Sequence, residues 1–180
     1  VVAGKGADNL GMQCGGWSID WQGGQGDITI GTTILDGIKK TVSESTEIIY
    51  SEDGSDVVPN SDNIAVVVIG EDPYTEWFGD KENLDLSDDD INLINDLKDK
   101  GFKVAVLLIS GRPLNVANHI DQWDAFAAIW LPGTEGDGVS DVLFGDFGST
   151  GRLSFPWPIN TEEGSNADKD NLLFEIGYGL

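Results

Sequence analysis

Short, almost wholly apolar runs alternate along the chain with segments whose apolar residues recur at helical spacing. The runs at 64–69 and 104–109 predict strands that are buried on both faces of a parallel sheet. The same reading predicts further strands at 1–3, 46–50 and 126–131, an extended edge at 152–158, and helices beginning near Thr32, Ser87, Leu114 and Val139. This alternation, with short connections, predicts an α/β fold: one three-layer α/β/α sandwich domain over residues 1–180, with a mostly parallel sheet.

The loop at 70–80 follows the apolar run at 64–69 and carries four carboxylates and several aromatic rings. Loops that leave the carboxyl ends of strands are where open α/β sheets carry out their chemistry. Glu76 lies between Tyr74 and Trp77, and we expect these aromatic walls to exclude solvent from it. Such desolvation raises the pKa of a carboxyl group and makes it a proton donor. Glu76 is therefore a candidate catalytic acid, although acidic residues on loops are more often simply solvated.

Trp17 and Trp21 lie in a glycine-flanked segment with little hydrophobic periodicity to bury them. The flat face of tryptophan suits the apolar face of a pyranose ring, and the neighbouring Asp20 and Gln22 are placed to bond sugar hydroxyls. Protein interfaces favour tryptophan equally. The residues alone leave three roles open: core packing, a partner interface and a sugar platform.

Acidic residues dominate the composition, with 32 Asp and Glu against 10 Lys and Arg, for a net charge of −22 in 180 residues. Binding to nucleic acid needs a basic face that displaces counterions, and anionic membrane surfaces attract basic segments. We therefore expect neither nucleic acid nor a membrane as a partner. The longest apolar runs are short beside the ~20 residues of a transmembrane helix.

The sequence offers no convincing cofactor or metal motif. Cys14 is the only cysteine and His119 the only histidine, which argues against a disulfide and a Cys/His zinc site. We expect His119 to lie at the solvated end of a helix, not in a catalytic triad. The glycine-bearing segment 4–9 fails the dinucleotide fingerprint, because Asn9 takes the third glycine position and no helical pattern follows.

One polar segment looks superficially like a calcium loop. Asn166, Asp168 and Asp170 match the start of such a loop. Asn171, however, stands where an EF-hand needs glycine. We therefore expect no metal and no cofactor.

Taken together, several segments resemble the C-terminal α/β domain of the family 3 glycoside hydrolases, and particularly its β-glucan exohydrolase branch. The segments are short, and their order and spacing carry the resemblance over nearly the whole chain. They are 2–4, 7–11, 14–23, 31–35, 70–76, 108–113, 130–136, 143–148 and 177–180.

The resemblance implies retaining hydrolysis of β-glucosidic bonds from the non-reducing end of a β-glucan, outside the cell or in the periplasm. It implies that Glu76, in Pro73-Tyr74-Thr75-Glu76, is the acid/base. It further implies that Trp21, with Trp17 as its neighbour, forms one wall of an aromatic clamp over the leaving-group sugar.

The resemblance also implies that the aspartate nucleophile belongs to an N-terminal barrel domain, which this chain lacks. The opening at 1–4 looks like the tail of a strand, and we expect the chain to be a piece of a longer protein that is inactive by itself. A non-catalytic glucan-binding module and an interdomain scaffold remain as alternative functions.

Overall fold

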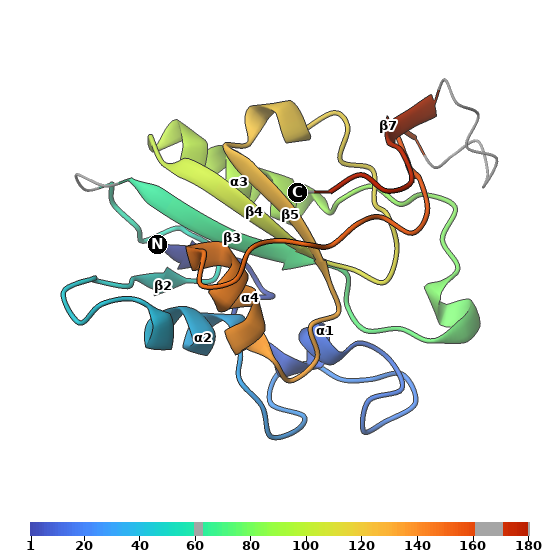
Figure 1. The fold of residues 1–180 in the computed structure, drawn as a ribbon, viewed down its shortest axis with the longest axis horizontal. Coiled ribbons are helices and arrows are strands. Elements are labelled where there is room, and N and C mark those ends of the chain that lie inside the picture. The colour runs from blue at the N-terminus through green and yellow to red at the C-terminus, as the bar shows by residue number, and fades with distance from the viewer. Residues whose placement is uncertain (60–62, 161–170, 180) are drawn as a thin grey trace.

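The computed structural model describes residues 1–59, 63–160 and 171–179. Within them, five parallel strands form a central sheet in the order β2-β1-β3-β4-β5 (Figure 1). The strands are β1 (Val2–Ala3), β2 (Tyr50–Ser51), β3 (Ile64–Gly70), β4 (Lys103–Ile109) and β5 (Ala125–Trp130). A separate antiparallel pair consists of β6 (Trp157–Pro158) and β7 (Leu172–Phe174). The parallel sheet expected from the apolar runs is confirmed.

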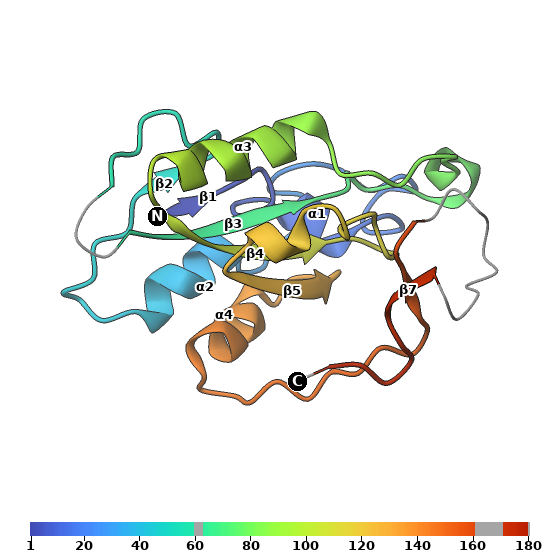
Figure 2. The ribbon, with the colours of Figure 1, turned by 90° about the horizontal axis from the view of Figure 1, so that it is seen from above.

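Helices cover both faces of the sheet, which confirms the three-layer sandwich (Figure 2). Helix α3 (Asp88–Asp99) lies on one face, and α2 (Ile34–Thr41) and α4 (Gly136–Phe144) lie on the other. Ser87 and Thr33 cap α3 and α2, because each hydroxyl accepts a hydrogen bond from a backbone N–H in the first turn. The short helix α1 (Leu10–Cys14) covers the same sheet face as α2, and its Met12 belongs to the core cluster on that face.

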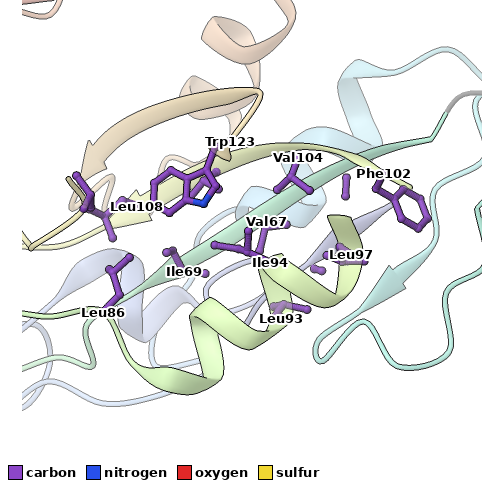
Figure 3. Packing of buried hydrophobic residues seen from close by; sticks show 14 of the residues in the cluster. Val67, Ile69, Leu86, Leu93, Ile94, Leu97, Phe102, Val104, Leu108 and Trp123 are labelled. Atoms are coloured by element: carbon purple, nitrogen blue, oxygen red, sulfur yellow. The ribbon is translucent and has the colours of Figure 1, made fainter. Parts of the chain in front are cut away.

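Alternate residues of β3 enter different cores, which explains why its sequence is an unbroken apolar run. Val67 and Ile69 belong to the cluster that packs against α3, as Figure 3 shows. Val66 and Val68 belong to the cluster beneath α2. On the α3 side the helix contributes mainly Ile94 and Leu97, which are almost completely buried.

Two predicted elements differ from the structure. The strand expected at 46–50 is limited to Tyr50–Ser51, because its neighbour β1 offers only two residues to pair with. The helix expected near Leu114 does not form; the nearest helical turn is a 3₁₀ turn, η2 (Ile120–Gln122). His119 precedes this turn and is half-buried, so it is not at the solvated end of a helix.

Two further expectations are wrong in detail. A helix does follow the glycine-bearing segment at 4–9, since Asn9 caps α1 by accepting a hydrogen bond from the backbone N–H of Met12. In the extended edge expected at 152–158, only Trp157–Pro158 forms a strand. The calcium-like residues Asn166, Asp168 and Asp170 lie outside the described residues.

The strand order creates a switch point between β1 and β3. From β1 the chain crosses to β2 at one edge, whereas from β3 it proceeds to β4 on the other side. Ligands of open α/β sheets bind beyond the carboxyl ends of the strands at such a point. The loop at 71–81 leaves β3 there. None of the helices in the described ranges is long and apolar enough to cross a membrane.

Candidate active site

A buried ion pair holds together the loop that follows β3. The carboxylate of Glu71, with its side chain only 7% exposed, accepts hydrogen bonds from Arg112 Nη2 at 2.7 Å and from Arg112 Nε at 3.2 Å. Arg112 Nη1 donates to the carbonyl oxygen of Gly79 at 2.6 Å. Arg112 therefore binds the first part of the loop and its far end at once, and fixes the segment between them.

Tyr74 completes this clamp, which we define as Glu71, Tyr74 and Arg112. The guanidinium of Arg112 lies over the Tyr74 ring at 4.6 Å from its centroid, and the hydroxyl donates to Glu71 Oε2 at 3.3 Å. Burial, and then the charge of Glu71, raise the pKa of Tyr74 to about 12. A side chain at Gly79 would collide with this ring, since a Cβ there would lie 2.3 Å from Cδ2. The loop is thus rigid on its inner side.

Glu76 lies on the outer side of the same loop, at the start of the 3₁₀ turn η1 (Glu76–Gly79). Its φ of 49° is unusual for a residue other than glycine, and such backbone strain costs ~1–3 kcal/mol and clusters at functional sites. The residue is exposed. The burial expected from its aromatic neighbours is therefore not found in this chain: Tyr74 belongs to the clamp, and Trp77 is itself 61% exposed.

Four aromatic rings from two separate loops form a cluster, and one of them belongs to Trp77, the residue after Glu76. The Trp21 ring makes edge contacts with Trp77 and Phe78, at centroid distances of 5.6 Å and 5.9 Å, and the Trp17 ring lies 6.4 Å from Trp21. Trp17 is 68% exposed and Trp21 40% exposed. Core packing, one of the three roles left open by the sequence, is therefore wrong for both tryptophans.

Close backbone contact brings these two loops together. A Cβ at Gly16 would lie 2.2 Å from the carbonyl oxygen of Tyr74, so only glycine permits this approach. The side-chain oxygen of Gln22 accepts a hydrogen bond from the backbone N–H of Thr75 at 3.3 Å. Gln22 Nε2 and Thr75 Oγ1 are buried without a hydrogen-bond partner within the described ranges, and Thr75 directly precedes Glu76 in the chain.

A cleft of about 370 Å³ opens at the switch point, and Tyr74 and Phe78 contribute to its lining. Lys5, from the loop after β1, lies 3.6 Å from Asp72 and 4.0 Å from Asp90 across this cleft. Asp90 is buried, and this burial raises the pKa of its carboxyl group. Within the described residues, no three His, Cys, Asp or Glu side chains are grouped to hold a metal ion.

The structure brings the loop that carries Trp17 and Trp21 against the loop that carries Glu76, through the contact of Trp21 with Trp77 and the approach of Gly16 to Tyr74. Sequence reasoning missed Phe78 as a ring of the same cluster. The available signal was its position in the chain, because it follows Glu76 by two residues in the loop already singled out.

Comparisons with known proteins agree on one family. The family model of the glycosyl hydrolase family 3 C-terminal domain matches residues 1–180. A solved structure of a mutant exo-1,3/1,4-beta-glucanase (ExoP) from a Pseudoalteromonas species is 40% identical, with a TM-score of 0.86, over 99% of this chain and 31% of that one.

Two curated relatives match the whole chain. The lysosomal beta glucosidase of Dictyostelium discoideum is 29% identical, and the match covers 25% of its length. The periplasmic beta-glucosidase of Salmonella typhimurium is 25% identical, and the match covers 30% of its length. The chain therefore spans between a quarter and a third of the length of these relatives.

Proposed function

The chain belongs to glycosyl hydrolase family 3, in which it forms the C-terminal domain, and we propose that it supplies the acid/base carboxylate, Glu76, of a retaining exo-acting enzyme. This enzyme is a β-glucosidase or β-glucan glucohydrolase that releases glucose from non-reducing ends. The names of the three relatives described above, two beta-glucosidases and an exo-1,3/1,4-beta-glucanase, support the substrate class.

One observation carries the assignment of Glu76. It occupies a strained, exposed position on a loop that the clamp holds rigid, directly beside an exposed aromatic surface. Catalytic groups must be held within narrow limits of the productive geometry, and a rigid support provides this. Strained backbone kept in place by its surroundings is typical of functional sites.

In the proposed mechanism Glu76 first donates its proton to the glycosidic oxygen as the bond breaks. It then removes a proton from the water that hydrolyses the glycosyl-enzyme intermediate. The nucleophile of this mechanism is an aspartate of the barrel domain, which must lie only ~5–5.5 Å from Glu76. The isolated 180-residue chain is therefore inactive, and the barrel and the sugar supply the desolvation that Glu76 lacks in this chain.

Trp21 stacks on the leaving-group sugar in this proposal, and the barrel provides the opposing wall, with Trp17 beside it. The 40% exposure of the Trp21 side chain leaves a surface free for such contact. A polymeric substrate and relatives named periplasmic and lysosomal support an extracellular or periplasmic location.

The exposed aromatic cluster also favours a second candidate, a glucan-binding or interdomain scaffold module without catalytic groups of its own. Binding of laminari-oligosaccharides to the isolated chain, with loss of binding in Trp21→Ala, supports the binding module. Self-association of the isolated chain with rising concentration supports the scaffold.

The test of the acid/base role is Glu76→Gln in the full-length enzyme, with azide as an external nucleophile. We expect hydrolysis of natural glucans to be largely abolished, and azide to restore turnover of an activated aryl glucoside. Glu82→Gln, at an exposed residue of the neighbouring segment, is the matched control and should behave as the parent. Near-parental turnover of glucans by Glu76→Gln would contradict the proposal.

A further inference from the structure

Trp77 and Phe78 form an exposed aromatic pair that the proposed catalytic role of Glu76 does not explain. Their rings are stacked, with centroids 5.7 Å apart and an interplanar angle of 29°. Trp77 is 61% exposed and Phe78 is 59% exposed. Contiguous exposed apolar surface that is rimmed by polar residues is typical of a binding site, whereas a single exposed apolar residue is not.

The position of the pair relative to Glu76 indicates what it binds. Consecutive Cα atoms are 3.8 Å apart, so the Cα of Phe78 lies no more than about 7.6 Å from that of Glu76. A general acid protonates the oxygen that joins the departing sugar to the cleaved one. Sugar units beyond that oxygen therefore leave the active site close to Trp77 and Phe78.

The surroundings of the pair suit a carbohydrate chain better than an apolar protein surface. Asp80 and Lys81, which follow η1, are exposed. Phe78 also lines the polar cleft at the switch point, where Asp72 and Asn83 face the same space. Sugar rings combine apolar faces with hydroxyl edges, so flat aromatic rings bordered by carboxylate, amide and ammonium groups match them on both counts.

The pair is already fixed in place before any ligand arrives. The backbone N–H of Phe78 donates to the Thr75 carbonyl, and that of Asp80 donates to the Trp77 carbonyl. Arg112 holds Gly79 at the end of the same turn through its 2.6 Å hydrogen bond. A preformed platform gains affinity because little side-chain or loop entropy is lost on binding.

We propose that Trp77 and Phe78 form a sugar subsite on the leaving-group side, beyond the sugar that contacts Trp21. This subsite makes the enzyme selective for glucans of three or more units over cellobiose- or laminaribiose-sized substrates. The proposal rests on the proposed function, since it takes the leaving-group side from the role of Glu76.

The experiment measures kcat/KM of the full-length enzyme for an aryl β-glucoside, laminaribiose and laminaritetraose. We expect the parent to prefer the tetraose over the biose. In Trp77→Ala and Phe78→Ala the ratio of kcat/KM for tetraose to that for biose should fall about 2- to 13-fold per ring, which corresponds to ~0.5–1.5 kcal/mol. Trp77→Phe, which keeps a ring, should retain part of the preference.

Phe147→Ala is the matched control, because Phe147 is an equally exposed aromatic residue beyond α4, at 68% exposure. It should keep the parental ratio. The proposal is overturned if the parent shows no preference for the tetraose, if the ratio is unchanged in Trp77→Ala and Phe78→Ala, or if all three substrates lose equally. An equal loss indicates that the rings support the loop or the barrel interface. A different variant tests the acid/base role: near-parental glucan hydrolysis by Glu76→Gln would contradict that role and not the subsite.

Discussion

Two glutamates five positions apart in one loop have opposite surroundings. Glu71 is 7% exposed in its side chain, and Arg112 and Tyr74 bind its carboxylate, with Lys81 Nζ at 3.5 Å. Glu76 is exposed and has a left-handed backbone. The hydrogen-bonded carboxylate of Glu71 stabilises the loop, whereas the exposed carboxylate of Glu76 is available for chemistry.

This contrast teaches that the two roles depend on each other. The charge of Glu71 is neutralised inside the protein, and the resulting clamp holds η1 through Gly79. A fixed η1 in turn keeps Glu76 in its strained conformation. Changes on the Glu71 side should therefore alter stability first, whereas changes at Glu76 should alter activity first.

The largest effect on stability is expected from Arg112→Ala. Removing one partner of a buried ion pair costs ~3–5 kcal/mol, because the other charge remains buried. We expect a loss of about 3 kcal/mol, at the lower end of this range, since Lys81 still faces Glu71. Urea unfolding of the 180-residue chain measures this loss in the free energy of unfolding. Arg152→Ala removes an arginine whose hydrogen bonds within the described residues go to exposed carbonyls, and it should change the free energy of unfolding by less than ~1 kcal/mol.

A smaller effect of opposite sign is expected from Glu76→Gly. Glycine adopts positive φ without strain, so this substitution should raise the free energy of unfolding by about 1 kcal/mol while it removes the proposed acid. The same substitution at Glu82, where φ is not positive, should lower the free energy of unfolding through the added freedom of the unfolded chain. Equal signs at both positions would show that the strain at Glu76 is not real.

The smallest effect at neutral pH is expected from Tyr74→Phe, which removes one hydrogen bond to Glu71 and should cost about 0.5 kcal/mol, the lower end for a net hydrogen bond, because the bond is long at 3.3 Å. The pH dependence is more informative. The folded state raises the pKa of Tyr74 to about 12, so the stability linked to its neutral form is complete below its ordinary value of 10.0 and is lost as the pH rises through 12. Unfolding of the parent between pH 9 and 12 should show this loss, and Tyr74→Phe should lack that component.

The sheet was predictable because a strand buried on both faces has a continuous run of apolar residues. Strand β3 sends alternate residues into two cores, and every one of them must be apolar. Strand β2 was overestimated because its length depends on its partner, β1, and not on its own β-branched residues. The helix expected near Leu114 does not form, although Leu114 and Val116 are both buried.

The site was predictable only in part, because its contacts join segments distant in sequence. Glu76 and Trp21 could be proposed from a loop, an aromatic motif and a family resemblance, and their roles stay predictions. The hydrogen bonds from Arg112 to Glu71 join residues 41 positions apart, and no periodic pattern in the sequence predicts them. The exposure of Glu76 was also missed. Successive side chains on a 3₁₀ turn point about a third of a turn apart, so the next residue in the chain does not cover Glu76.

The most direct test of the central claim compares leaving groups in Glu76→Gln of the full-length enzyme. A general acid contributes ~10²–10⁴-fold, and only where the leaving group needs a proton. We predict that kcat/KM for laminari-oligosaccharides falls by that factor, whereas kcat/KM for a dinitrophenyl β-glucoside falls far less. Equal losses for both substrates, or no loss for either, would contradict the assignment of Glu76 as the acid/base.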